Sequence, residues 1–343
     1  MKIFYAASYG KDNLKGIYIL SLDEQTLEMN LIRQIHTDDF PSYLICRNHN
    51  LYVAYKNASS HNNGGGLGSF SIKDDDLILN NNYSSSGRSY THLCIDHNND
   101  YIFAANYHFG ATASYKLEDY CIKEKIMAKR HVGKGPDLLK RQTAPHAHYV
   151  GFTPDERFLY SVDLGADKVF MYDYTEGILQ ENLDYTLNVV PGSGPRHMIF
   201  SPDGQFSYLV NEIANTIMVF KYIEGRFNLV QAVSSIPRYF TGFSSAAAIR
   251  MTSNGSHLFV SNRGHDSIAM YRINKETGKL SLLYMVHTAK EPRDFNIIDD
   301  RYLIVASQSE NKLQLLTFDQ ENEKLLMSDS EIEVPAPICI AFE

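Results

Sequence analysis

Histidine, arginine and glutamate side chains stand at the ends of short apolar segments from residue 148 onward. His148, Arg196, Glu212 and Arg263 are the clearest examples, and Arg293 is a further arginine of this kind. Guanidinium groups bind anions through parallel N–H donors, and an imidazole or carboxylate beside them can move a proton. If the fold gathers these residues, the sequence predicts a site for an anionic substrate with an acid or base next to it.

Each of these residues also has a purely structural interpretation. Glu212 could pair with the arginines and tie neighbouring elements together, and His148 could be a hydrogen-bonded histidine at the start of a strand. Asp163 and Asp167 are typical of a turn. The convergence of several such residues is what favours a functional site.

The elements that must position them belong to a repeat. A short apolar strand that ends in small or polar residues begins at Phe4, Leu51, Ile102, Leu159, Ser207, Leu258 and Leu303, 45 to 57 residues apart. Most copies follow an apolar strand with a Pro-Asp or Asn-Gly turn and precede two further strands. Four antiparallel strands per repeat describe one propeller blade. The sequence therefore predicts an all-β, seven-bladed β-propeller, with residues 1–343 as a single domain.

The two ends of the chain are expected to meet in one blade. First strands begin near Pro41, Thr91, His148, Arg196, Ala247 and Pro292, one fewer than the second strands. The chain thus opens on a second strand, and the segment from Pro337 to Phe342 supplies the missing first strand, which closes the ring. No window holds a helical period with caps at both ends. The stretches 57–68 (Asn57 to Gly68) and 130–145 are expected to be loops, the first of them mobile.

Blade geometry selects the residues of the site. The start of a first strand and the end of a second strand lie at the same end of an antiparallel sheet, so these positions should converge on the mouth of the central channel. We expect His148, Arg196, Glu212 and Arg263 to be catalytic. The residues expected to bind substrate are Arg293, Asn106, Asn211, Asn262 and His197.

Composition excludes several classes of function. The net charge is −8, and no run of Lys and Arg could follow a phosphate backbone, so nucleic acid is not an expected partner. No signal peptide or membrane-spanning stretch is present, which predicts a soluble, cytoplasmic protein. The cysteines Cys46, Cys94, Cys121 and Cys339 are widely spaced and are expected to be buried free thiols. No HExxH, Gly-x-Ser-x-Gly or P-loop motif occurs, so neither metal nor cofactor is expected.

Several segments carry a family resemblance. They are Pro145-His-Ala-His-Tyr-Val150, Tyr160-Ser-Val-Asp-Leu-Gly-Ala-Asp-Lys168, Gly194-Pro-Arg-His197, Ser201-Pro-Asp-Gly204, Val210-Asn-Glu212, Ser261-Asn-Arg-Gly-His-Asp-Ser-Ile268 and Pro292-Arg-Asp-Phe295. Together they resemble the motifs of the seven-bladed propeller lactonases, a family that includes bacterial 6-phosphogluconolactonase and fungal carboxymuconate lactonizing enzyme. The resemblance covers nearly the whole chain, and the segment from Ser261 is its most specific element.

The resemblance implies a functional set. It consists of a His before the Pro-Asp turn, the Arg of Gly-Pro-Arg, the Glu of Asn-Glu and the Arg of Asn-Arg-Gly, which are His148, Arg196, Glu212 and Arg263. Two places depart from the family pattern. His108 and Phe109 stand where small residues are frequent, and Lys56 stands where an acidic residue is frequent.

Hydrolysis of 6-phosphogluconolactone to 6-phosphogluconate, in the pentose phosphate pathway, is the leading hypothesis. Glu212 or His148 would be the general base, while Arg196 and Arg263 stabilise the oxyanion or hold the phosphate. A carboxymuconate-type cycloisomerase and a non-catalytic binding scaffold are the alternatives. The expected partner is a small anionic lactone, with no nucleic acid or membrane, and the chain is expected to be a monomer or a weak homo-oligomer.

Overall fold

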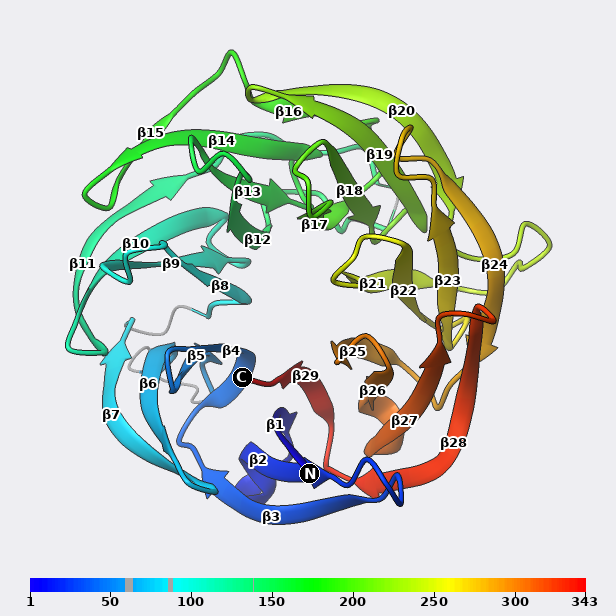
Figure 1. Cartoon of the computed structure of the whole chain (residues 1–343). Coiled ribbons are helices and arrows are strands. Elements are labelled where there is room, and N and C mark those ends of the chain that lie inside the picture. The colour runs from blue at the N-terminus through cyan, green and yellow to red at the C-terminus, as the bar shows by residue number, and fades with distance from the viewer. Residues whose placement is uncertain (59–63, 86–88, 138) are drawn as a thin grey trace. The chain divides into compact units, whose positions relative to one another are not determined.

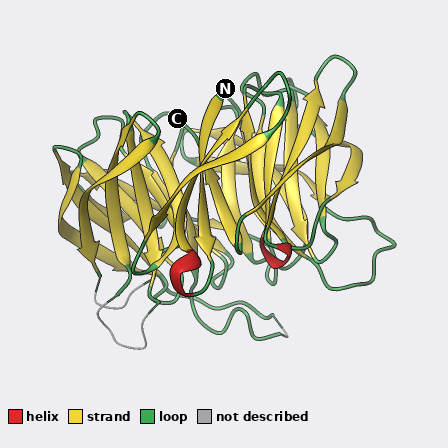
Figure 2. Ribbon diagram, turned by 90° about the horizontal axis from the view of Figure 1, so that it is seen from below, coloured by secondary structure: helices red, strands yellow, loops and turns green. Residues whose placement is uncertain are grey.

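The computed structural model describes residues 1–58, 64–85, 89–137 and 139–343. Its regular structure is almost entirely β-strand (Figure 2). Within these residues the helices are two three-residue 3-10 turns, η1 (Asp12–Leu14) and η2 (Gln308–Glu310). No helix in the described part of the chain is long and apolar enough to cross a membrane.

The strands form seven antiparallel sheets of four strands, one of which carries an additional short strand. In a typical sheet the second strand is buried along its whole length, whereas the fourth strand is largely exposed on one face. This gradient explains why the second strands read as continuous apolar runs and were the easiest repeat to detect. The predicted all-β, seven-bladed β-propeller is confirmed.

The chain divides into two compact units, which are described separately. The first consists of residues 1–93, 116–124 and 288–343, and the second of residues 94–115 and 125–287. That residues 1–343 form a single domain stays a prediction. One sheet has strands in both units: β8 (His92–Ile95), β9 (Tyr101–Asn106), β10 (Ala111–Glu118) and β11 (Cys121–Arg130).

Three sheets belong to the first unit. The first is formed by β1 (Lys2–Tyr9), β2 (Lys15–Leu22), β3 (Met29–His36) and β29 (Pro337–Ala341). The second is formed by β4 (Phe40–Arg47), β5 (Asn50–Lys56), β6 (Gly66–Lys73) and β7 (Asp76–Ser84). The third is formed by β25 (Pro292–Ile298), β26 (Tyr302–Ser307), β27 (Lys312–Asp319) and β28 (Lys324–Glu333).

The C-terminal strand completes the N-terminal sheet. β29 pairs antiparallel with β1, with Tyr5 opposite Ala341 and Ala7 opposite Cys339 (Figure 1). β29 thus pairs with the edge of β1 and becomes the first strand of this four-stranded sheet. The expected closure by the segment from Pro337 is confirmed.

Three further sheets belong to the second unit. One is formed by β12 (Ala147–Phe152), β13 (Leu159–Asp163), β14 (Lys168–Thr175) and β15 (Ile178–Glu181), with β16 (Leu187–Asn188) paired to β14. The next is formed by β17 (Pro195–Phe200), β18 (Phe206–Asn211), β19 (Thr216–Ile223) and β20 (Arg226–Ser234). The last is formed by β21 (Ser245–Met251), β22 (His257–Arg263), β23 (Ser267–Ile273) and β24 (Leu280–His287).

A β-bulge recurs near the start of the first strands. In β12 the pairing passes from Ala147 to Tyr149, and in β17 it passes from Pro195 to His197, so His148 and Arg196 each occupy the unpaired position. β4, β25 and β29 carry the same irregularity, and β21 shifts register between Ala246 and Ile249. A bulge breaks strict alternation and redirects the extra side chain. His148, Arg196 and Arg293, three of the residues expected at the site, therefore stand at these bulges.

Apolar side chains of neighbouring sheets pack against each other to form the cores. In the second unit, one cluster joins Tyr208 and Val219 to Leu258 and Val260 of the next sheet. Full burial of a side chain of this size contributes roughly 1.5–3 kcal/mol. The tight turns follow the predicted chemistry: Gly204 and Gly255 have φ of 71° and 67°, which glycine adopts without strain.

Two local expectations need correction. Gly66 to Gly68 belong to β6, so the irregular segment after β5 is shorter than 57–68, and the mobility predicted for it falls largely on residues 59–63, outside the described residues. All four cysteines are free, but Cys339 alone of them is buried, because the other three stand at or near the ends of their strands, where they are half-buried. The irregular stretch 130–145 is confirmed over residues 131–137 and 139–145.

Candidate active site

Glu212 and Arg196 come together at the edge of one sheet in the second unit. Pro195 in β17 is paired with Asn211 in β18, so the residues that follow them meet at the same end of the sheet. Nε of Arg196 donates to Oε2 of Glu212 across 3.1 Å. Both side chains are almost fully buried, and their carboxylate and guanidinium satisfy each other there.

Two more arginines reach the same carboxylate. Arg263, at the end of β22 in the neighbouring sheet, places Nη2 at 2.9 Å from Oε2 of Glu212. Arg141, in the loop between β11 and β12, forms an ion pair with Oε1 of Glu212. The exposed fraction of these side chains rises from 5% for Arg196 to 15% for Arg263 and 36% for Arg141.

Arg141 was not anticipated from the sequence. It lies in the connection from β11 to β12, which is longer than the corresponding connections of the other blades, so aligning the blades could not place it beside Glu212. The available signal was its position seven residues before His148, in the loop that leads into the strand of a candidate base.

The charges around Glu212 determine its protonation. Burial alone would raise the pKa of this carboxyl group, but Arg263, Arg196, His148 and Arg141 together outweigh burial and hold it well below its usual range. Glu212 is therefore a permanent carboxylate at neutral pH and a weak proton acceptor. Its three arginine contacts suit it to orienting guanidinium groups.

Arg196 also contacts the neighbouring sheet that contains β21, and the side chain of His197. Its Nη1 donates to the backbone carbonyl of Ala247, at the bulge of β21, across 2.8 Å. The same nitrogen lies 3.0 Å from Nε2 of His197, which must act as the acceptor because a guanidinium only donates. The Arg196 fork is thus fixed on several sides.

His148 lies beside this cluster. It occupies the bulge of β12 and is buried, with its ring centroid 5.1 Å from that of His197. Tyr107 meets His148 edge-on at 5.8 Å and stacks on His146 at 4.4 Å with an interplanar angle of 9°. Aromatic packing thereby holds the imidazole next to the residues that surround Glu212.

The three predicted asparagines each hold a turn or a neighbouring strand. Oδ1 of Asn106 accepts from the backbone N–H of Phe109 across 2.9 Å, and Nδ2 of Asn211 donates to the hydroxyl of Thr216 across 3.0 Å. Nδ2 of Asn262 donates to the backbone carbonyl of Ser235 across 2.8 Å. These contacts give the asparagines a structural role, and substrate binding by them stays a prediction.

Arg293 lies in the first unit. It occupies the bulge of β25, where it is half-buried and its charge acts on Tyr9. Its expected part in anion binding stays a prediction.

Asp163 and Asp167 do more than form the turn expected of them. Oδ1 of Asp163 accepts from the backbone N–H of His146 across 2.7 Å, which fixes the entry to the strand of His148. Asp167 accepts from the N–H groups of Gly192 and Gly194, across 2.7 and 2.8 Å, and so fixes the loop that leads into Arg196. Oδ1 of Asp167 also accepts from Nε2 of Gln142 across 2.7 Å, beside Arg141.

A second histidine–carboxylate pair lies deeper in the second unit. Nδ1 of His131 is 2.6 Å from Oδ2 of Asp163, and its Nε2 is 3.1 Å from the hydroxyl of Thr112. The side chains of His131 and Asp163 are completely buried, and the His131 ring stacks on Phe170. A substrate could not reach this triad, so it stabilises the sheet.

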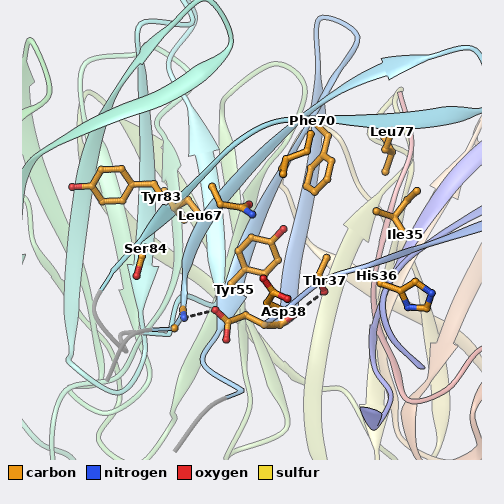
Figure 3. A pocket seen from close by; sticks show the side chains of 15 residues that line it. Ile35, His36, Thr37, Asp38, Tyr55, Leu67, Phe70, Leu77, Tyr83 and Ser84 are labelled. Atoms are coloured by element: carbon orange, nitrogen blue, oxygen red, sulfur yellow. Dashed lines mark hydrogen bonds between the residues drawn. The ribbon is translucent and has the colours of Figure 1, made fainter. Parts of the chain in front are cut away.

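The first unit contains a cavity of about 580 Å³ between its β3–β4 connection and β5, β6 and β7. Its lining includes the apolar side chains of Leu67 and Phe70 together with Tyr55 (Figure 3). Both carboxylate oxygens of Asp39 are occupied by the backbone N–H groups of Ala58 and Gly65. The cavity is thus lined by both apolar and polar side chains, and it lacks the clustered cations that distinguish the Glu212 site.

The Glu212 cluster has the parts that acyl transfer to water requires. Arg196 and Arg263 are fixed guanidiniums that could stabilise a developing oxyanion, and His148 is a proton acceptor beside them. Within the described residues, no three His, Cys, Asp or Glu side chains converge in a way that could hold a metal ion.

Comparisons with known proteins agree with this chemistry. Residues 3–342 match the family described as "Lactonase, 7-bladed beta-propeller". The chain is 32% identical to the 6-phosphogluconolactonase of Bacillus subtilis over 99% of its own length and 98% of that protein. It resembles the crystal structure of a Lactobacillus plantarum protein, with a TM-score of 0.93 and 29% identity, over 100% of this chain and 99% of that one.

A third relative is the periplasmic gluconolactonase of Pseudomonas aeruginosa. The TM-score is 0.93 at 28% identity, over 99% of this chain and 98% of that one. The family match and the Bacillus relative each span nearly the whole chain. The chain belongs to the seven-bladed β-propeller lactonase family.

Proposed function

We propose that the chain hydrolyses 6-phosphogluconolactone to 6-phosphogluconate, with Glu212 and its surrounding residues as the active site. The family match and the name of the Bacillus relative support a lactone substrate of this kind. The observation that carries the site assignment is the binding of one buried carboxylate by three guanidiniums, beside a buried histidine.

His148 is the proposed general base. Two candidates follow from the sequence, and the lowered pKa of Glu212 argues against the carboxylate, because a strongly stabilised anion accepts a proton poorly. His148 would take a proton from the attacking water while the water oxygen bonds to the lactone carbonyl carbon. The protonated imidazole would then give that proton to the ring oxygen as the carbon–oxygen bond breaks and the ring opens.

Arg196 and Arg263 are proposed to stabilise the oxyanion. Negative charge develops on the carbonyl oxygen as water adds, and preorganised donors in a water-poor site stabilise it most effectively. Both guanidiniums are mostly buried and are held in place by Oε2 of Glu212. Glu212 would orient the two donors without joining the proton transfer.

The direct test is turnover of 6-phosphogluconolactone, followed as acid release in a pH-stat at neutral pH. The wild-type protein should exceed the spontaneous rate, and His148→Ala should lose roughly 10²–10⁴-fold in kcat. His49→Ala is the matched control, because that histidine is 84% exposed and lies in the first unit. A wild-type rate equal to the spontaneous one would reject the function. A His148→Ala variant as fast as the control would reject the base.

The cellular setting belongs to the same proposal. A phosphorylated sugar lactone is a cytoplasmic metabolite of the pentose phosphate pathway, which accords with the compartment predicted from the sequence. Fractionation of cells that express the chain would test this, and recovery in an extracytoplasmic fraction would contradict it. That the chain is a monomer or weak homo-oligomer stays a prediction.

A further inference from the structure

Arg141 differs from the two other arginines that hold Glu212. Arg196 and Arg263 belong to strands and are 5% and 15% exposed, whereas Arg141 belongs to a loop and is 36% exposed. Arg196 and Arg263 also donate to the backbone carbonyls of the bulged strand β21, at Ala247 and Ala246. Arg141 is therefore the guanidinium of the three that solvent, and a ligand from solvent, reaches most easily.

The backbone around Arg141 is nevertheless fixed. Its N–H donates to Oδ2 of Asp137 across 2.7 Å. Gln142 is 1% exposed, and its Nε2 donates to the carbonyl of Leu164 and to Oδ1 of Asp167, both across 2.7 Å. The loop thus presents Arg141 at a defined place, so that binding has to order little beyond the side chain itself.

The two oxygens of Glu212 divide the arginines into two sets. Arg196 and Arg263 share Oε2, and Arg141 contacts Oε1. If Arg141 turned toward a ligand, Oε2 would keep both buried arginines. The contact between Arg141 and Oε1 can therefore be exchanged for a ligand while Arg196 and Arg263 stay on Oε2.

The charge balance of this cluster favours an anion. Three guanidiniums carry three positive charges, and Glu212 supplies one negative charge, which leaves two positive charges among these four residues. A phosphate monoester carries close to two negative charges at neutral pH and accepts the two parallel donors of an arginine fork. The lactone ring itself is neutral, so the phosphate is the group that would respond to this excess.

Tyr107 places Arg141 near the proposed base. Burial alone would lower the pKa of Arg141, but Glu212 and Tyr107 raise it above its ordinary value, so both groups interact with the guanidinium. The Tyr107 ring also meets His148 edge-on at 5.8 Å. An anion on Arg141 would therefore be held on the same side of the cluster as His148.

We infer that Arg141 binds the anionic group of the substrate that is remote from the lactone carbonyl, and that it determines a preference for phosphorylated over unphosphorylated lactones. The inference rests on the proposed function and deepens it. Arg196 and Arg263 serve the reacting carbonyl, and Arg141 serves the phosphate.

The test compares 6-phosphogluconolactone with glucono-δ-lactone in the wild type and in Arg141→Gln. The ratio of kcat/KM for the phosphorylated lactone to that for the unphosphorylated one should fall by about 20-fold or more, chiefly through a higher KM for the phosphorylated lactone. Arg141→Lys should restore part of the ratio, because it keeps the charge and loses the fork. A ratio equal to that of the wild type, whether both activities fall together or neither falls, overturns the inference.

The matched control is Lys134→Gln, which removes one positive charge from an exposed position on the same loop. It should leave the ratio at the wild-type value. An equal loss in this variant would mean that the general charge of the loop is responsible, and that outcome also contradicts a specific role for Arg141. Melting temperatures of all variants verify that each is folded.

Failure of the proposed function can be separated from failure of this inference. If the wild type hydrolyses neither lactone, the proposed reaction is wrong, and binding of inorganic phosphate is measured by titration calorimetry instead. Binding that weakens about 10-fold or more in Arg141→Gln, and not in Lys134→Gln, supports the anion site. The anion site at Arg141 is overturned if the wild type does not bind phosphate, or if the wild type and Arg141→Gln bind it equally.

Discussion

Arg196 stands in β17 and Glu212 directly follows the adjacent antiparallel strand β18, and Nε of the arginine is 3.1 Å from Oε2 of the carboxylate. The same arginine reaches the carbonyl of Ala247 in the neighbouring sheet. One guanidinium therefore serves two purposes, since it is a blade-to-blade tie as well as a donor held beside a site. The structural and the functional interpretations of Arg196 are compatible rather than exclusive.

Replacing Arg196 by lysine tests both roles together. An ammonium group cannot reproduce the planar fork that reaches Glu212 and Ala247 at once, so kcat/KM should fall roughly 10²-fold. The melting temperature should fall by about 2–4 °C for each kcal/mol that the lost tie contributed. Arg250→Lys is the matched control on β21, and it should keep wild-type activity. An Arg196→Lys variant with wild-type turnover and a lowered melting temperature would show that the residue is merely a tie.

Replacing Glu212 by glutamine leaves three guanidiniums without their shared anion. Breaking a buried ion pair by removing one partner typically costs about 3–5 kcal/mol, so the free energy of unfolding should fall by about that amount. Urea denaturation followed by circular dichroism would measure it, with Glu276→Gln at an exposed turn as control. Activity should fall as well, because the arginines lose their orientation. A Glu212→Gln variant as stable as the control would contradict this, because it would show that water or other groups balance the positive charges of the arginines.

The lowered pKa of Glu212 predicts how stability changes with pH. In the unfolded chain this carboxyl group titrates near 4.5, and in the folded chain it titrates lower. The stability that Glu212 contributes is therefore complete above about pH 4.5 and is lost as the pH falls toward the folded value, at up to about 1.4 kcal/mol per pH unit. The difference in unfolding free energy between wild type and Glu212→Gln should shrink as the pH falls below about 4.5. A difference that shrinks on raising the pH would contradict this sign.

The repeats explain why much of this site was predictable. His148 and Arg196 stand at the bulge of a first strand and Glu212 stands just after a second strand, so aligning the turns of the blades finds them. The bulges themselves were not expected from the sequence. They nevertheless fall on the aligned positions, because each precedes its turn by a similar distance.

The contacts that were missed involve loops whose sequences do not repeat. Arg141 lies in a stretch that connects β11 to β12, and no other blade contains an equivalent from which its position could be read. Asp167 looked like a turn residue because its local sequence is a turn, and its carboxylate contacts lie 25 and 27 residues away. Contacts of this kind depend on which loops the fold brings together, and a linear pattern contains no period that reveals them.

Asp167 provides the last prediction. Its carboxylate accepts from Gly192 and Gly194, before Arg196, and from Gln142, beside Arg141, so it anchors the loop that leads into Arg196 and the loop that contains Arg141. Asp167→Asn keeps the size of the side chain but replaces one acceptor oxygen by an N–H₂ group. This group can only donate, so it cannot accept the hydrogen bond that the oxygen accepted. The free energy of unfolding should fall by about 1–3 kcal/mol, and KM for 6-phosphogluconolactone should rise about 10-fold as the loops loosen.

The matched control for Asp167 is Asp203→Asn, which alters an aspartate in an exposed turn after β17, where Asp203 accepts from Ser201 and Gln205. It should change neither KM nor kcat. If Asp167→Asn lowers stability and leaves KM unchanged, the aspartate merely stabilises the fold. The two substitutions alter the same chemical group and differ in the loops that this group holds. A raised KM in Asp167→Asn with an unchanged KM in Asp203→Asn would therefore establish that the loops must be anchored for Arg141 and Arg196 to meet the substrate.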